Sequence, residues 1–223
     1  MTTDAEFELH PDVMKEERQR TEEVTSANNI KKRFGEVVEA STMEFTTQSY
    51  RLYEAPPLGS LVRCGDDSPV YGVVYDVANR SMDPARHPIP RGEDEASEEA
   101  VYLSNPQLER LLSTELRSIT VGHRAEGDLR REPAPAPPRI HSFVYQCDGQ
   151  ELREFSGSLD FLSTLLNSPV AGARDDVIAA FLRQAGAAHP EPRRFMVDAG
   201  KELAVLLGGS LPRLNNVLKR IAT

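Results

Sequence analysis

Tryptophan is absent from this sequence, and all aromatic residues together make up only 6% of it. Surfaces that stack the bases of single-stranded nucleic acids need several exposed aromatic rings, so this scarcity disfavours such a platform. A surplus of basic residues is also lacking, because 35 acidic residues stand against 26 lysines and arginines, for a net charge of −9. Proteins that bind nucleic acids usually carry a basic surface that neutralises phosphates, so the overall charge points away from that class.

Cysteine is rare, with Cys64 and Cys147 as the only two. Neither belongs to a C-x-x-C pair, so no zinc site is predicted, and two isolated thiols are typical of a reducing compartment. The first residues are acidic and no apolar run follows them, which is unlike a signal peptide. No stretch approaches the roughly 20 apolar residues that cross a bilayer. We therefore expect a cytoplasmic protein without a membrane segment.

Signatures of catalysis and of metal or cofactor binding are also lacking. No two of the five histidines have the i, i+4 spacing of a helical metal pair, and the motifs G-x-S-x-G and G-x-x-x-x-G-K-[ST] do not occur. His123, His141 and Asp128 could converge, but histidines near strand ends are more often solvated or simply hydrogen-bonded. We predict no catalytic residue, no metal site and no cofactor, and expect that the protein is not an enzyme.

What the sequence does contain, from residue 33 to residue 148, is a series of short strand patterns. Runs rich in β-branched and aromatic residues alternate with Gly, Pro and Asp turns, at 34–41, 44–52, 60–64, 70–77, 118–122 and 140–146. The run 70–77 is apolar on both alternating faces, which suits a strand buried on two sides. We predict the α+β class: an N-terminal small closed antiparallel β-barrel of about six strands, followed by a C-terminal helical part.

The expected organisation has three parts. Residues 1–32, with eight acidic and five basic residues, are a flexible charged leader. Residues 33–148 form the barrel, and Asp148-Gly149 is interpreted as a hairpin turn near its end. Residues 149–223 have the 3.6-residue period of about four short amphipathic helices.

The barrel is predicted to contain a long loop over 79–104 and a short helix over 106–116. Asn105-Pro106 resembles a helix start, and leucines follow at helical spacing. Long loops on rigid scaffolds commonly carry recognition, and this one contains three prolines and an acidic run. A merely solvated loop remains the alternative. The candidate partner-binding residues are Arg86, Arg91, Glu93 and Glu95.

The charge is locally reversed at residues 191–223, which carry six basic against three acidic residues. A basic helix face can bind phosphates, although a solvated face is the more common role. The candidate nucleic-acid contacts are Arg193, Arg194, Lys219 and Arg220.

Three stretches that contain glycine follow one another in an order that is typical of a known small barrel. They are Phe34-Gly35-Glu36-Val37-Val38-Glu39-Ala40-Ser41 with Glu44-Phe45-Thr46, then Leu58-Gly59-Ser60-Leu61-Val62 leading into Val70-Tyr71-Gly72-Val73-Val74-Tyr75-Asp76-Val77, and finally Val121-Gly122 with Pro137-Pro138-Arg139-Ile140-His141. Their order resembles the HAS barrel, the small barrel shared by HerA-type DNA-translocating ATPases and the catalytic subunits of rotary ATP synthases. The resemblance covers about residues 33–146, roughly half of the chain.

The chain departs from the HerA pattern after the barrel. HerA-type ATPases continue into a P-loop domain, whereas the only Gly-Lys here, Gly200-Lys201, lies in a predicted helix. The resemblance therefore implies a standalone HAS-barrel protein without a motor, whose role is to assemble rings and dock accessory proteins. We expect a non-enzymatic adaptor or assembly module in DNA processing that docks through its barrel on a HerA-like ATPase or a nuclease. A homo-oligomer and a nucleic-acid-binding accessory protein that uses the basic C-terminal helices remain open alternatives.

Overall fold

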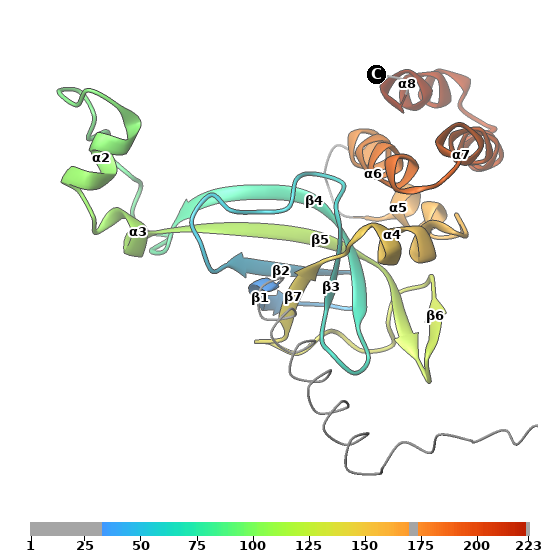
Figure 1. Cartoon of the computed structure of the whole chain (residues 1–223), viewed down its shortest axis with the longest axis horizontal. Coiled ribbons are helices and arrows are strands. Elements are labelled where there is room, and N and C mark those ends of the chain that lie inside the picture. Colours follow the sequence, from blue (N-terminus) through green and yellow to red (C-terminus); the bar gives the residue numbers. More distant parts are fainter. Residues whose placement is uncertain (1–32, 170–173, 222–223) are drawn as a thin grey trace, which may run out of the picture. The chain divides into compact units, whose positions relative to one another are not determined.

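The computed structural model describes residues 33–169 and 174–221, so the expected leader over residues 1–32 lies outside the described residues. Residues 34–223 form one unit that contains both the sheet and the helices (Figure 1). The strands are β1 (Arg33–Ala40), β2 (Glu44–Ser49), β3 (Leu61–Cys64), β4 (Val70–Ser81), β5 (Leu112–Ala125), β6 (Asp128–Arg130) and β7 (Phe143–Gln146). The helices are α2 (Glu98–Ser104), α3 (Leu108–Leu111), α4 (Gly149–Ser156), α5 (Leu162–Asn167), α6 (Arg174–Ala188), α7 (Pro192–Leu206) and α8 (Leu211–Ile221).

The strands form one sheet in the order β2-β1-β7-β3-β4-β5-β6, and β2 also pairs with β5. The pairings of β1 with β2, of β2 with β5, and of β4 with both β3 and β5 are antiparallel. Strand β2 is therefore hydrogen-bonded along both of its edges. The predicted α+β class, with an antiparallel sheet before a C-terminal helical part, is confirmed. None of the helices in the described part of the chain has the length and apolar character that a membrane span requires.

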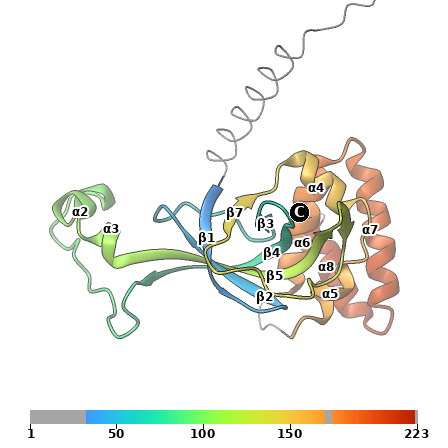
Figure 2. The same ribbon diagram turned by 90° about the horizontal axis from the view of Figure 1, so that it is seen from below.

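The first half of strand β4, Val70–Tyr75, is buried on both faces, as its continuous apolar sequence predicts. Tyr71 and Val73 belong to a hydrophobic core that the sheet shares with the helices, including the side chain of Phe181. Val70 and Val74 belong to a second core, which draws residues from β1, β2, β3, β4, β5 and β7. Figure 2 shows α4 to α8 gathered at one side of the sheet. The helical part thus packs against the sheet as well as within itself.

The helical part begins at Gly149, the first residue of α4. The predicted hairpin turn at Asp148-Gly149 is wrong, because Asp148 is the N-cap of α4. Its carboxylate accepts hydrogen bonds from the backbone N–H groups of Gln150 (2.9 Å) and Glu151 (3.0 Å), and Glu151 accepts one from the N–H of Asp148 at 3.0 Å. This reciprocal capping box favours a helix start over the turn that an Asp-Gly pair also allows.

The predicted helix over 106–116 is also wrong in most of its length. Only Leu108–Leu111 are helical, and Leu112 already begins β5. Leu112 and Leu116 are four residues apart, a spacing that lies on one face of a strand as well as on one face of a helix. Pairing decides between the two, because Leu116 lies opposite both Val77 of β4 and Thr47 of β2.

The predicted loop over 79–104 is shorter than expected at both ends. Strand β4 continues through Ser81, and α2 occupies 98–104. The hydroxyl of Ser97 caps α2 by accepting a hydrogen bond from the N–H of Ala100 at 3.2 Å. Glu98 and Glu99 then lie in the first turn, where negative charge stabilises a helix. Part of the acidic run is therefore a helix start and not a loop.

Candidate protein-docking site

Strands β4 and β5 extend beyond the rest of the sheet as a two-stranded arm. Strand β2 makes its last pairing with β5 between Gln48 and Glu115. Beyond that pair, Asn79–Ser81 of β4 continue to pair with Leu112–Thr114 of β5. Residues 82–111, here called the arm end, complete the connection and include α2 and α3 (Figure 1). The arm end is therefore held to the sheet mainly by two paired strands.

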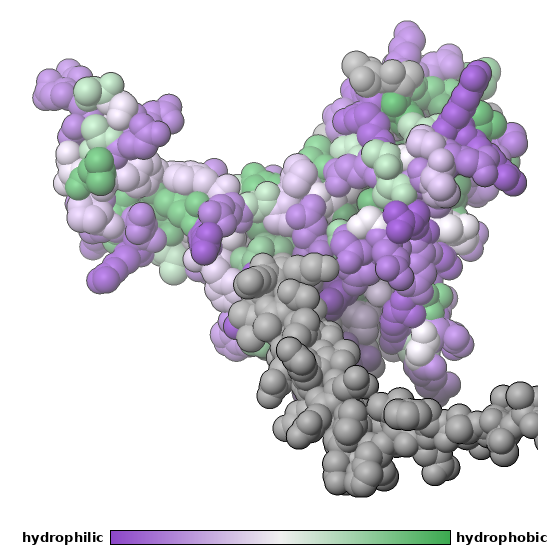
Figure 3. Space-filling model, in the orientation of Figure 1, coloured by the Kyte–Doolittle hydropathy of each residue, from purple (hydrophilic) through white to green (hydrophobic). Residues whose placement is uncertain are grey.

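The arm end exposes large apolar side chains and has no core of its own. Neither α2 nor α3 contains a buried residue. Leu103 is 82% exposed and Ile89 is 67% exposed, and Met82 and Leu111 are also exposed. Figure 3 shows hydrophobic and hydrophilic residues side by side over this part of the chain. Full burial of one such side chain contributes about 1.5–3 kcal/mol, so a partner that covers the arm end gains from the contact.

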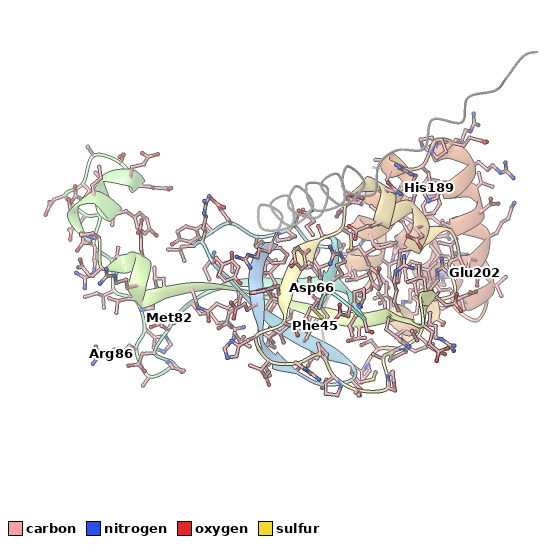
Figure 4. The ribbon with its side chains drawn as sticks, turned by 60° about the horizontal axis from the view of Figure 1, so that its bottom comes forward. Phe45, Asp66, Met82, Arg86, His189 and Glu202 are labelled. Atoms are coloured by element: carbon pink, nitrogen blue, oxygen red, sulfur yellow. The ribbon has the colours of Figure 1, made fainter. Side chains whose placement is uncertain are left out.

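All four predicted partner-binding residues lie in the arm end. Arg86 forms an exposed ion pair with Asp83 at 3.2 Å and points away from the sheet (Figure 4). Arg91 donates to Asn105 Oδ1 at 3.2 Å, which ties the loop to the end of α2. Glu93 is exposed and Glu95 is half-buried in the turn that precedes α2. Within the described residues, no hydrogen bond or ion pair joins any two of the four.

The arm end is acidic. It carries seven acidic residues against three arginines, which gives a net charge of −4 over 30 residues. Opposite charge speeds encounter and selects partners more than it adds affinity. The arm end therefore favours a partner whose contacting surface is basic.

A cleft lies between the arm end and the loop that follows β2. It has a volume of about 440 Å³. It is lined by Tyr50, Arg51, Leu52, Tyr53, Glu54, Tyr102 and Glu109, and we call it the tyrosine cleft. The rings of Tyr53 and Tyr102 are 6.0 Å apart at 84°, and their hydroxyl groups are hydrogen-bonded to each other.

The base of the arm holds Tyr53 in place. Its N–H donates to Thr114 Oγ1 at 2.7 Å, and the Thr114 hydroxyl donates to Asn79 Oδ1 at 2.7 Å. Tyr53 has φ +67°, a conformation that is costly for a bulky side chain. The hydrogen bond with Tyr53 raises the pKa of Tyr102 to about 12, with smaller contributions from burial and from the charge of Glu98. Sequence reasoning missed this site, because no local pattern links two tyrosines that are 49 residues apart.

The four candidate nucleic-acid residues lie at helix ends. Arg193 and Arg194 are in the first turn of α7, and Lys219 and Arg220 are in the last turn of α8. Arg194 is 3.7 Å from Glu191, and Arg220 forms an ion pair with Asp176. A phosphate must therefore compete with a carboxylate for at least two of these four cations.

The two thiols are buried, and His123 and His141 each lie within hydrogen-bond distance of a nearby group. Burial raises the pKa of Cys64 to about 12 and that of Cys147 well above its usual range, so both thiols are protonated at neutral pH. His123 Nδ1 lies 3.2 Å from the carbonyl oxygen of Glu132, whereas His141 Nδ1 lies 2.9 Å from Glu36 Oε2. The two histidines therefore engage different partners. In residues 33–169 and 174–221, no three His, Cys, Asp or Glu side chains are grouped to hold a metal ion.

A serine and a histidine that the sequence did not relate lie in contact between helices. Ser156 Oγ is 2.8 Å from His189 Nε2, beside a cleft of about 280 Å³. The Ser156 hydroxyl donates to the carbonyl oxygen of Leu152 at 2.6 Å, so the imidazole must donate its Nε2–H to the serine. A general base would need the opposite arrangement. The pair therefore ties α4 to the segment between α6 and α7.

We expect this tie to make stability depend on pH. Burial, together with the charge of Arg153, lowers the pKa of His189. Its contribution to stability is thus fully present above the unfolded value of about 6.5 and is lost as the pH falls below it, because the unfolded chain takes up the proton first. His189→Gln retains a donor and removes the titration. Thermal unfolding at pH 8 and pH 5.5 should show a smaller loss for this variant than for the wild type, and equal losses would contradict the assignment.

The chain was compared with known families and proteins. No family model matches it, and no curated protein matches its sequence. The resemblance to HAS barrels therefore stays a prediction. The geometry of the arm end and of the tyrosine cleft carries the functional proposal instead.

Proposed function

We propose that this protein is a non-enzymatic adaptor or assembly module that docks on a partner protein through its arm end. The observation that carries the proposal is that α2 and α3 bury none of their residues while Leu103 and Ile89 are mostly exposed. A segment of this kind adds little to the stability of its own chain, and its exposed apolar side chains are available for burial by a partner. The net charge of −4 favours a basic partner surface.

The rigid base of the arm, in this proposal, is a closed six-stranded barrel of the HAS type. Two observations support closure: β2 pairs with both β1 and β5, and one hydrophobic core draws residues from all six strands. The resemblance of the strand order then suggests a HerA-like ATPase or a nuclease as the partner, and a role in DNA processing. A cytoplasmic location agrees with two buried cysteines that form no disulfide.

A deletion that leaves the sheet intact tests the proposal. Ser81 and Leu112 are paired in the arm, so residues 82–111 can be replaced by Asn-Gly, a two-residue hairpin turn. Because α2 and α3 bury nothing, we expect the free energy of unfolding to change by no more than about 1 kcal/mol. Purification from the host with quantitative mass spectrometry should recover a partner with the wild type and lose it with the deletion.

A matched surface variant controls for indirect effects. Leu211 of α8 is 66% exposed, and Leu211→Ser alters a remote apolar site of similar exposure to Ile89. This variant should retain the partner. A partner that persists after the arm end is deleted would refute the proposal, as would a deletion that unfolds the protein.

A second candidate function is nucleic-acid binding through the C-terminal helices. The observation in its favour is the net charge of +3 over residues 191–223, six basic against three acidic, in a chain of net charge −9. The experiment is binding to a short labelled duplex at about 50 mM salt, where phosphate contacts are strongest. Absence of binding there removes this candidate.

A further inference from the structure

The tyrosine cleft has aromatic walls on more than one side. Tyr53 and Tyr102 meet nearly at right angles, and Tyr50 lines the same space. Tyr50 and Tyr53 are 50% and 53% exposed. The face of an aromatic ring carries partial negative charge and attracts a cation within about 6 Å of the ring centre. Several rings around one space therefore favour a positively charged group.

Carboxylates strengthen this preference. Glu54 and Glu109 line the cleft, and Arg51, the one cation among the described residues that line it, is 3.4 Å from Glu54. Glu109 forms no ion pair with another described residue, so two carboxylates line the cleft against one arginine. Glu98 adds negative charge near Tyr102, since its carboxylate contributes to the raised pKa of that phenol. An anionic ligand would meet these carboxylates, whereas a cation would be attracted by them and by the rings.

We propose that the tyrosine cleft receives the side chain of a lysine or an arginine from the partner protein. The cleft, at about 440 Å³, has room for the charged group together with its aliphatic stem, and Leu52 offers an apolar contact for that stem. A protein is the source because Tyr102 belongs to the arm end, whose net charge of −4 extends the same preference over a larger surface. The inference rests on the proposed docking function and names the chemistry of the partner.

The six tyrosines of the chain allow a direct test. Three line the cleft, and the other three, Tyr71, Tyr75 and Tyr145, are only 3%, 8% and 4% exposed and serve as internal controls. The full chain is labelled with 3-fluorotyrosine, and its ¹⁹F signals are assigned by single Tyr→Phe substitutions. N-acetyl-arginine methylamide and N-acetyl-lysine methylamide are titrated as probes, and the norleucine analogue is the neutral control.

We expect saturable shifts of the Tyr50, Tyr53 and Tyr102 signals with at least one cationic probe and not with norleucine. Glu109→Gln should weaken the binding about two- to fivefold, the range of an exposed ion-pair contact. Glu126→Gln, which removes an exposed carboxylate that does not line the cleft, should leave it unchanged. The proposal is overturned if no saturable shift occurs, if norleucine acts equally, or if the buried tyrosines shift to the same extent.

The two proposals fail in different ways. If the probes do not bind but deletion of residues 82–111 still releases the partner, the docking function stands and the cation site is wrong. If the probes bind but the partner persists after deletion, the cation site stands and the docking function is wrong.

Discussion

An alanine in place of Phe161 is expected to lower the free energy of unfolding by about 3–5 kcal/mol. Phe161 is fully buried, and its ring lies 5.1 Å from that of Phe155 and 5.0 Å from that of Phe181. Tyr71 of β4 continues this row of rings at 5.3 Å from Phe155. The substitution leaves a cavity where the helices meet the sheet, and close-packed surroundings collapse only in part.

Chemical denaturation measures this loss. Phe161→Leu is the matched control, because it keeps most of the volume and should cost less than the alanine variant. Domains commonly have only about 5–15 kcal/mol of stability, so the alanine variant could fail to fold. In that case the smaller loss in the leucine variant still measures the contribution of the ring. A loss below about 1 kcal/mol for Phe161→Ala would contradict the conclusion that packing among these rings is a main source of stability.

Gly59→Ala is the substitution with the second largest expected effect, a loss of about 2–4 kcal/mol. Gly59 has φ +79°, and an added Cβ would lie 2.6 Å from both the Cβ of Ala180 and the backbone nitrogen of Phe181. The N–H of Gly59 also donates to the carbonyl oxygen of Val74 at 2.8 Å. The residue is thus fixed between β4 and α6, and neither neighbour can move away without disturbing the shared core.

Gly127→Ala separates the two causes of this effect. Gly127 has φ +89°, yet an added Cβ would meet nothing within 4 Å. It should therefore show only the backbone cost, about 1 kcal/mol. Similar losses in thermal or denaturant unfolding for both variants would mean that contact with α6 contributes nothing at Gly59.

The strands were predictable from sequence where the pattern of apolar residues matches the faces of the strand that are buried. Val70–Tyr75 is apolar on both faces because one face meets the helices and the other meets the second core, whereas Val77 is 38% exposed. Leu116 was misplaced because its spacing from Leu112 fits both periods, and only pairing with distant strands decides. Asp148 was misread for a related reason, since an Asp-Gly pair serves both hairpin turns and helix caps.

The candidate site was predictable only in outline. Prolines and acidic residues marked the segment that holds Arg86 and Glu93, because such composition disfavours regular structure and burial. The tyrosine cleft could not be predicted in this way. Tyr53 follows β2 and Tyr102 lies between β4 and β5, so the pairing of β5 with both β2 and β4 brings them together, and no local sequence feature indicates these pairings.

Site-specific photo-crosslinking in the host tests the docking surface most directly. The photoreactive residue p-benzoylphenylalanine replaces Leu103 of α2, which is 82% exposed, or, in a matched control, Leu211 of α8, which is 66% exposed. We expect a discrete crosslinked protein from position 103 and none from position 211. A crosslink that forms only from position 211 would contradict docking through the arm end.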